Sequence, residues 1–326
     1  MARDHLIRVS DLSVTYCADE GMPIRAVDGI SLEISPQEIV GILGESGCGK
    51  STLAGALLRL LPPGAKSEGG ILFRGLELMN LPEAELRALR GREIALIPQD
   101  PALSLNPVIT AGVLIGEVLR AHLPLSAAER RQRVKELLCE VGFDRPEEIY
   151  SAYPHQLSGG QRQRIAIAQA MACRPGLLVA DEPTGKLDAT LQSEIIELLS
   201  KIRQQHGTAI LIISHDPAIL AGFSDRIAVM YAGRIVEVGS SAEIFGRPLH
   251  PYTQALMRIA SSMITSAGVI SRFPAIAGES PDPGCIAEGC RFEPRCSERM
   301  DVCSQRYPQT FLPEPSRLVN CFKYGE

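Results

Sequence analysis

Polar and apolar residues alternate with a period of two in the first part of the chain, at residues 12–16 and 30–34. This period predicts half-buried strands, and we expect them to form an antiparallel β-subdomain. Short apolar runs bounded by turn residues follow at residues 39–43, 94–97, 177–180 and 209–213. Such runs are typical of strands buried on both faces, and the helical patterns between them indicate a mostly parallel α/β sheet.

The stretch between Pro107 and Ser158 contains no comparable strand run. Residues 127–141 within it instead carry apolar positions at helical spacing. We therefore predict an inserted helical subdomain over about residues 107–170.

The later part of the chain predicts a hairpin and then a domain boundary. Two strand-like runs within residues 227–238 flank Ala232-Gly233, a pair typical of a tight turn. Glycine and proline become frequent at residues 266–284. We expect a main domain over residues 1–260 and a small C-terminal extension over residues 261–326.

The composition is that of an ordinary globular protein. The 326 residues are 45% hydrophobic and 22% charged, enough for one large core and an appendage. No apolar run reaches the roughly 18 residues of a bilayer-spanning helix, and the N-terminus lacks a signal-peptide pattern, so we expect the chain to stay in the cytoplasm. The net charge of −5 predicts no general attraction to nucleic acid, and the arginine-rich run at residues 130–133 indicates a solvated helix face.

The nine cysteines are unevenly distributed along the chain. An odd number in a chain without an export signal argues against a disulfide framework, because cytoplasmic thiols stay reduced. Five of them crowd into the end of the sequence: Cys285, Cys290, Cys296, Cys303 and Cys321. This clustering requires an explanation of its own.

A glycine-rich segment lies between the apolar run at residues 39–43 and a helical run at residues 52–61, and it matches a complete phosphate-binding loop: Gly44-Glu45-Ser46-Gly47-Cys48-Gly49-Lys50-Ser51. Its glycines let backbone N–H groups close around phosphates, and the following helix N-terminus favours negative charge. We expect Lys50 to reach the β- and γ-phosphates of ATP and the Ser51 hydroxyl to bind Mg²⁺. These eight residues and Thr52 form the predicted ATP site.

A second apolar run, residues 177–180, ends in the carboxylates of Asp181 and Glu182, at the sheet edge where open α/β folds bind ligands. Asp181 can orient Mg²⁺ and its waters. Glu182 is then placed to polarise the attacking water, because in-line phosphoryl transfer needs positioning and charge stabilisation. The alternative for this pair is a solvated strand end.

A third motif lies between the phosphate loop and the acidic pair, and its Ser-Gly-Gly makes a second anion-binding helix N-terminus: Leu157-Ser158-Gly159-Gly160-Gln161. With this motif the chain resembles the ATP-binding cassette (ABC) family, whose signature is LSGGQ, over residues 6–260. The resemblance implies a P-loop NTPase fold of the ABC cassette type and hydrolysis of ATP to ADP and phosphate. It also implies head-to-tail pairs in which Ser158 and Gly160 contact the γ-phosphate held by the partner.

Further positions resemble the family one by one. Gln99 looks like the glutamine that senses Mg²⁺ and the membrane partner, and His215 like the histidine that contacts the γ-phosphate. Asp188 matches the aspartate of the dimer interface. Tyr16 is a candidate to stack on adenine, or equally a strand aromatic that faces the core.

One segment departs from the family pattern. Gly185-Lys186 stand where family members generally have small or hydroxylated residues. We hypothesise that a long cationic side chain near the phosphates of a dimer interface favours a particular partner or changes turnover at one site.

Two segments resemble the ATPases of oligopeptide, dipeptide and nickel importers, at residues 99–107 and 250–256. His250 and Tyr252 in the second segment are expected to pack at a helix start rather than to act in catalysis. ATPases of this branch also carry a cysteine-rich C-terminal extension, and the matching residues here are Gly289-Cys290, Pro294-Arg295-Cys296, Cys303 and Asn320-Cys321.

Four thiolates brought together in this extension suit either an iron–sulfur cluster or tetrahedral zinc, and their spacing does not separate the two. The sequence lacks the tight C-x₂-C pairs common in zinc ribbons. We therefore favour a [4Fe–4S] cluster over zinc and over unligated buried thiols, on Cys290, Cys296, Cys303 and Cys321, with Cys285 as the spare.

The resemblance implies an importer ATPase at the cytoplasmic face of a bacterial inner membrane that drives uptake of di- or oligopeptides. Its implied partners are a second, non-identical ATPase subunit, two transmembrane permease subunits and, indirectly, an extracytoplasmic solute-binding protein. An importer of nickel or another small solute is the alternative, because the substrate pocket belongs to other chains. A soluble ABC ATPase acting on nucleic acid or ribosomes is disfavoured by the lack of a coiled-coil insertion, a second cassette and a basic surface signal.

Overall fold

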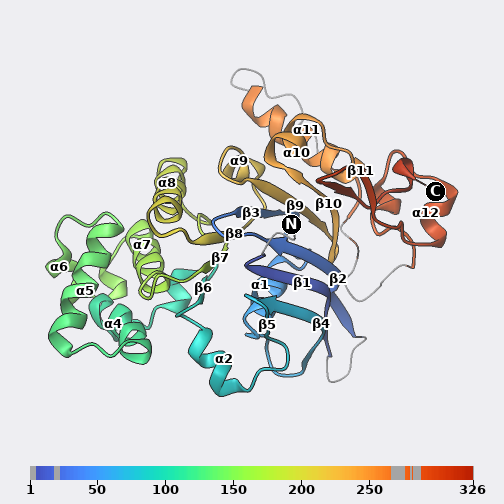
Figure 1. The fold of residues 1–326 in the computed structure, drawn as a ribbon. Helices are drawn as coiled ribbons and strands as arrows, with labels where there is room; N and C mark the ends of the chain where they lie inside the picture. The colour runs from blue at the N-terminus through green and yellow to red at the C-terminus, as the bar shows by residue number, and fades with distance from the viewer. Residues whose placement is uncertain (1–4, 18–22, 266–275, 280, 282–287, 326) are drawn as a thin grey trace. The chain divides into compact units, whose positions relative to one another are not determined.

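The computed structural model describes residues 5–17, 23–265, 276–279, 281 and 288–325, with only the backbone described at 261–265 (Figure 1). The chain divides into two compact units, each assembled from separate segments of the sequence. The first unit comprises residues 1–7, 34–38 and 73–213, and the second comprises residues 8–33, 39–72 and 214–326.

The second unit contains a mixed sheet in the order β11-β12-β10-β9-β3. Strand β3 (Ile39–Leu43) runs parallel to β9 (Arg226–Tyr231), and β10 (Arg234–Ser240) pairs antiparallel with β9. The predicted hairpin is therefore confirmed, and both loop residues, Ala232 at φ 44 and Gly233 at φ 85, have the positive φ that a two-residue turn requires. The outer strands, β11 (Phe311–Glu314) and β12 (Arg317–Val319), come from the C-terminal extension.

The other strands of the second unit lie side by side in the order β2-β1-β4. Their bounds are Ile7–Tyr16 for β1, Ile24–Ile34 for β2 and Ala65–Phe73 for β4. Leu12 and Val14 of β1 are buried, as the alternating pattern over residues 12–16 predicts. The remaining elements of this unit are α9 (Pro217–Leu220), α10 (Ser241–Gly246), α11 (Pro251–Thr265), α12 (Asp301–Gln305), η2 (Glu293–Arg295) and η3 (Phe322–Tyr324).

Helix α1 (Lys50–Leu57) is shorter than the helical run predicted over residues 52–61. It begins directly after Gly49 and stops before Arg59, which has φ 50. A residue in the left-handed region ends a helix because its backbone cannot continue the N–H to C=O ladder. The apolar pattern continues past Leu57, so periodicity alone placed this end too late.

The first unit contains three parallel strands in the order β8-β7-β6. They are β6 (Ile94–Ile97), β7 (Leu177–Asp181) and β8 (Ala209–Ser214). Every residue of β7 and β8 is buried, as expected for strands covered on both faces. Helices α2 (Glu83–Leu89), α3 (Pro101–Ser104) and α8 (Ala189–His206) and the short strand β5 (Leu76–Glu77) complete this part of the unit.

The remaining helices of the first unit gather in the green region of Figure 1. They are α4 (Ala111–His122), α5 (Ala127–Glu140), α6 (Pro146–Ser151), η1 (Pro154–Gln156) and α7 (Gly159–Ala170). Helix α5 matches the predicted helix, and Ser126 and Glu129 form a capping box at its start. The predicted limits of the helical subdomain, 107–170, and of the main domain, 260, stay predictions.

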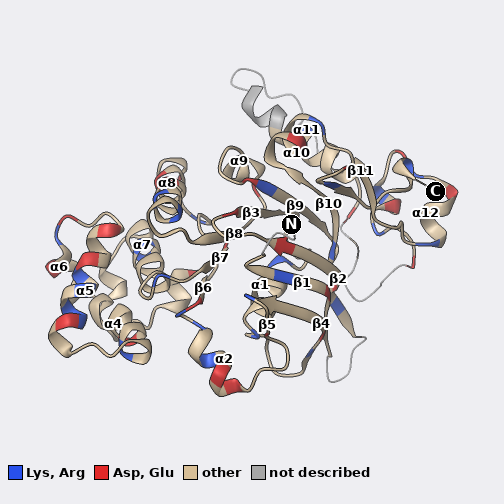
Figure 2. Cartoon of the chain, in the orientation of Figure 1, with Lys and Arg blue, Asp and Glu red and all other residues tan. Residues whose placement is uncertain are grey.

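Helix α5 also shows how the arginine-rich run is accommodated. Acidic and basic residues both occur along it in Figure 2, and Arg133 lies 3.2 Å from both Glu136 and Glu140. Its buried side chains are the apolar Val134, Leu137 and Leu138. The run therefore belongs to an amphipathic helix. Among the described residues, no helix has the length and apolar character to cross a bilayer.

The C-terminal extension is anchored to β10 through a buried ion pair. The Arg317 side chain donates to the Glu237 carboxylate at 2.9 Å, and both side chains are fully buried. Glu237 also accepts hydrogen bonds from the backbone N–H groups of Leu249 and His250, at 2.9 and 2.8 Å. A buried carboxylate with this many donors is well compensated for its lost hydration.

Candidate active site

The phosphate-binding loop, residues 44–51, leaves the end of β3 and enters α1. Gly49 has φ 103, and a Cβ atom there would lie 2.1 Å from the Ala26 carbonyl oxygen. A Cβ atom at Gly44 would lie 2.2 Å from the Met230 carbonyl oxygen. Both positions therefore require glycine, because the loop packs its backbone directly against neighbouring backbone.

Lys50 is the buried cation of this loop, with 5% of the residue exposed. Its Nζ donates to the carbonyl oxygens of Gly44 and Glu45, at 2.8 Å each. Ser51 follows at the first turn of α1 and is exposed. The ammonium group, the hydroxyl and the helix N-terminus thus gather beside one loop, and together they favour polyphosphate.

Tyr16 and His215 lie in the same unit as the loop. The half-buried Tyr16 ends β1, and its hydroxyl shares a 3.0 Å hydrogen bond with the Thr52 hydroxyl of α1. His215 is exposed between β8 and α9, where the Asp216 side chain caps α9 by accepting from Ala218 N–H at 2.9 Å. Tyr16 is thus hydrogen-bonded to the start of α1, and His215 lies directly before the residue that caps α9.

The acidic pair and Gln99 lie in the first unit. Asp181 is buried at the end of β7, and Glu182 follows with φ 46, where its N–H donates to the Ile213 carbonyl at 3.0 Å. The Gln99 Nε2 donates to the Glu182 Oε2 at 3.0 Å. Left-handed backbone is unusual for a glutamate and concentrates at functional sites. The structure therefore brings the Gln99 amide to the Glu182 carboxylate.

The signature motif forms the start of α7. Ser158 caps this helix, since its Oγ accepts from Gln161 N–H at 3.2 Å while the Gln161 side chain accepts from Ser158 N–H at 2.9 Å. Gly159 is exposed, whereas Gly160 is buried and a Cβ atom there would lie 3.2 Å from Leu191 of α8. The predicted helix N-terminus is confirmed, and Gly160 allows α7 to approach α8 closely.

The departure at Lys186 lies on the same segment as Asp188. Asp188 caps α8 by accepting from Leu191 N–H at 3.0 Å. Lys186 has φ 66 and an exposed side chain, and it donates to the Asp100 carboxylate. That hydrogen bond lowers the pKa of Asp100 below its usual value. Lys186 is thus linked to the residue that follows Gln99.

Four cysteines of the extension line one cavity, together with His250 and Phe292: Cys290, Cys296, Cys303 and Cys321. Burial raises the pKa of the Cys290 thiol to about 12 and also raises the pKa values of Cys296 and Cys321. Among residues that the structure describes, no three His, Cys, Asp or Glu side chains are arranged as metal ligands. The four thiols share a cavity, therefore, without forming a coordination shell. Cys285 lies outside the described residues.

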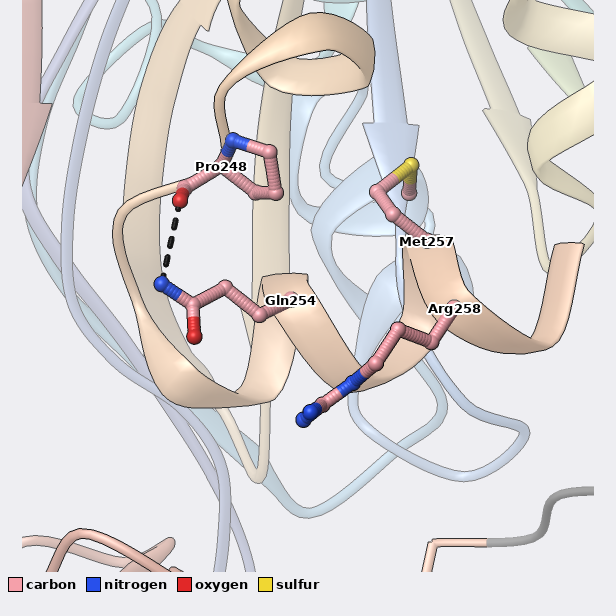
Figure 3. A pocket seen from close by; sticks show the side chains of 4 residues that line it. All are labelled: Pro248, Gln254, Met257 and Arg258. Atoms are coloured by element: carbon pink, nitrogen blue, oxygen red, sulfur yellow. Dashed lines mark hydrogen bonds between the residues drawn. The ribbon is translucent and has the colours of Figure 1, made fainter. Parts of the chain in front are cut away.

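His250 and Tyr252 have the helix-start role expected of them. The His250 Nδ1 accepts from Tyr252 N–H at 3.1 Å, at the beginning of α11. Figure 3 shows the neighbouring surface hollow, where Gln254 Nε2 donates to the Pro248 carbonyl at 3.2 Å and closes the turn before the helix. Met257 and Arg258 complete the lining of this hollow.

Sequence reasoning missed two residues that hold the phosphate loop. The Tyr252 hydroxyl accepts from Glu45 N–H at 3.0 Å, and Arg295 of the extension forms an ion pair with the Glu45 carboxylate. The Pro-Arg-Cys pattern indicates a role for Cys296, and it contains no signal for the arginine that precedes this cysteine. No periodicity connects residue 295 to residue 45.

Comparisons with known proteins match both the cassette and the C-terminal region of this chain to ABC transporter ATPases. Residues 27–185 match a family described as ABC transporter, and residues 236–303 match the family oligopeptide/dipeptide transporter, C-terminal region. The oligopeptide transport ATP-binding protein AppD of Bacillus subtilis is 42% identical over 98% of this chain and 97% of its own length. Two Escherichia coli proteins are similar: OppD (oligopeptide transport) at 40% over 98% and 94%, and DppD (dipeptide transport) at 42% over 97% and 96%.

Solved structures of ABC cassettes share the fold. The dimeric post-hydrolysis cassette MJ0796, bound to ADP and Pi, has a TM-score of 0.65 at 30% identity over 72% of this chain and 98% of its own. CbiO1 from Clostridium perfringens has a TM-score of 0.63 at 29% identity over 81% of this chain and 96% of its own. This chain therefore belongs to the ABC transporter family, as an ATPase of the branch that comprises the oligopeptide and dipeptide transport ATP-binding proteins.

Proposed function

We propose that this ATPase drives the uptake of di- or oligopeptides, at the cytoplasmic face of a bacterial inner membrane. The observation that carries the proposal is the full-length similarity to AppD, OppD and DppD, which extends through the C-terminal region as well as the cassette. We also propose that it works with a second, non-identical ATPase, two permease subunits and an extracytoplasmic solute-binding protein.

The phosphate loop and the acidic strand have separate tasks in hydrolysis. When ATP binds, Lys50 exchanges the carbonyl oxygens of Gly44 and Glu45 for phosphate oxygens, and the start of α1 supplies N–H donors. The Ser51 hydroxyl and the Asp181 carboxylate are hard oxygen donors that fit Mg²⁺, as is the Gln99 amide oxygen. A bound Mg²⁺ ion would neutralise negative charge on the phosphates of ATP.

Glu182 polarises the attacking water, and Gln99 senses Mg²⁺ and the membrane partner. The Gln99 amide donates to one carboxylate oxygen of Glu182, and a carboxylate is the acceptor that polarising a water molecule requires. His215 contacts the γ-phosphate from the turn after β8. Tyr16 stacks on adenine next to α1.

The signature residues act on ATP held by a partner cassette. As a helix cap, the Ser158 Oγ accepts a backbone hydrogen bond, and its own O–H remains able to donate to a phosphate oxygen. Together with the N–H groups of Gly159 and Gly160 it forms an anion-binding helix start, and Gln161 holds Ser158 in place. Asp188 belongs to the same dimer interface. Hydrolysis therefore depends on closure of a head-to-tail pair.

For the extension we propose a [4Fe–4S] cluster on Cys290, Cys296, Cys303 and Cys321, with zinc as the alternative. Four thiols lining one cavity are the soft donors that either centre takes, but they are not arranged as ligands among the described residues, so binding would have to draw them together. Burial raises the pKa values of the Cys290, Cys296 and Cys321 thiols, so metal binding must displace their protons. Iron and sulfide in anaerobically purified protein, with visible absorbance, would support the cluster. Zinc alone, or neither metal, would overturn it.

Co-purification of the membrane complex tests the transport proposal. We expect a second, different ATPase and two permease chains to purify with this one, and the associated binding protein to carry a peptide. ATP-dependent uptake of that peptide into vesicles containing the complex would support the proposal. Uptake of nickel or another small solute without peptide uptake would contradict it.

A further inference from the structure

The C-terminal extension reaches the phosphate loop through one arginine. The Arg295 guanidinium forms two parallel bonds to the Glu45 carboxylate, Nη1 to Oε2 at 2.8 Å and Nη2 to Oε1 at 3.0 Å. Only 6% of the Arg295 side chain and 25% of the Glu45 side chain are exposed. Bidentate, largely buried pairs of this kind are directional and strong.

Arg295 is itself fixed by its surroundings. Its Nη1 also donates to the Tyr231 hydroxyl at 3.2 Å, and its Nε donates to the Ala277 carbonyl at 3.1 Å. Tyr231 packs against Tyr252 and Phe292, with ring centroids 4.6 and 5.2 Å apart. The guanidinium therefore rests on an aromatic cluster contributed by β9, α11 and the extension.

Glu45 is held at three points. Its N–H donates to Tyr252, its carbonyl accepts from Lys50 Nζ, and its carboxylate binds Arg295. Lys50 must leave that carbonyl to reach the phosphates of ATP. A Glu45 carboxylate released from Arg295 would be a stronger partner for the Lys50 ammonium than a neutral carbonyl is, and it would repel the phosphates.

We propose that Arg295 is a positioning residue for ATP binding, which neutralises the Glu45 carboxylate and keeps it from competing with phosphate for Lys50. The inference concerns ATP binding by this chain and does not depend on which solute is transported. It gives the extension a direct part in the nucleotide site, separate from any centre held by its cysteines.

The test uses three variants of the full chain, Arg295→Ala, Arg295→Lys and Glu45→Gln, and the double variant Arg295→Ala/Glu45→Gln. Arg299→Ala is the matched control, because Arg299 lies in the same extension with 67% of its side chain exposed. ATP affinity is measured on the purified chain, KM and kcat on the assembled ATPase, and folding by thermal melting.

We expect Arg295→Ala to raise the Kd and KM for ATP about tenfold, with kcat changed less than about threefold, and Arg295→Lys to lie between it and wild type. Removing the glutamate charge should restore affinity in the double variant to within about twofold of Glu45→Gln alone. Arg299→Ala should bind ATP as wild type does.

Two results would overturn the proposal. One is wild-type ATP affinity in folded Arg295→Ala. The other is an affinity loss that Glu45→Gln fails to rescue, since that pattern belongs to a purely structural arginine. If Arg295→Ala fails to fold, the comparison of folded Arg295→Lys with and without Glu45→Gln decides between the same two outcomes.

Discussion

The phosphate loop and the C-terminal extension belong to the same unit, yet their structures depend on different kinds of information. The loop is a contiguous segment whose glycines, lysine and serine lie beside one another in the sequence. The extension is held by ion pairs between distant residues, Arg317 to Glu237 across 80 positions and Arg295 to Glu45 across 250. The chemistry of a contiguous motif can be recognised in the sequence. An ion pair between residues far apart in the sequence can be recognised only in the folded structure.

The largest loss of ATP turnover is expected for a substitution in the phosphate-binding loop, because its adjacent residues bind the phosphates of ATP. Lys50→Ala should lower ATP turnover at least about a hundredfold, because no other cation of the loop can neutralise the β- and γ-phosphates. Steady-state hydrolysis and ATP binding measure this loss. Lys201→Ala, at an exposed position paired with Glu197 on α8, is the control and should keep normal turnover.

Glu182→Gln should lower kcat by about a hundredfold or more while ATP binding is kept. The amide preserves shape but cannot polarise water, so an ATP-bound closed dimer should accumulate and be detectable by size-exclusion chromatography. Glu197→Gln, an exposed glutamate on α8, is the matched control. Full steady-state hydrolysis by Glu182→Gln would refute its catalytic role.

The buried strands and the family could be predicted from the sequence, and the extension's anchors could not. Apolar runs specify buried strands such as β7 and β8 because burial on both faces leaves no room for polar residues. The end of α1 was missed because Arg59 adopts a left-handed conformation that no periodicity encodes. Arg295 and Arg317 were missed because their partners lie far away in the chain. Their side chains are typical surface residues, and only the fold buries them.

Among the anchors, Arg317→Ala should destabilise the protein by about 3–5 kcal/mol, since it leaves the fully buried Glu237 without its cation. Denaturant unfolding measures the loss. Arg247→Ala is the control, because the Arg247 side chain is 66% exposed in its pair with Glu314, and it should cost no more than about 1 kcal/mol. Equal stability of the two variants would contradict the anchoring role of Arg317.

Acid should weaken the region around the extension through His250. Burial lowers the pKa of His250 to about 3, against an ordinary value of 6.5. Between those values the unfolded chain binds the proton and the folded chain does not, so stability falls as pH drops from about 6.5 towards 3, by up to about 1.4 kcal/mol per pH unit. His250→Asn should flatten this part of the pH profile of unfolding, whereas the exposed His155→Asn should leave it unchanged.

The smallest effect is expected at Lys186, whose ion pair with Asp100 is exposed. Lys186→Ala should change stability by less than about 1 kcal/mol. It should change the ATPase rate or the choice of partner cassette by about two- to threefold, because Asp100 adjoins Gln99. Unchanged ATPase rate and unchanged pairing would remove Lys186 from the account.

The proposal that this chain drives peptide uptake is tested most directly by measuring ATP hydrolysis by the purified membrane complex. The rate is measured in the presence of the binding protein, with and without peptide. If this ATPase drives peptide uptake, di- or oligopeptide should raise the rate, and Glu182→Gln in this chain should abolish the increase. A rate that is unchanged by peptide but raised by nickel or another solute would contradict peptide uptake. A peptide-dependent increase that remains in Glu182→Gln would contradict the catalytic role of Glu182.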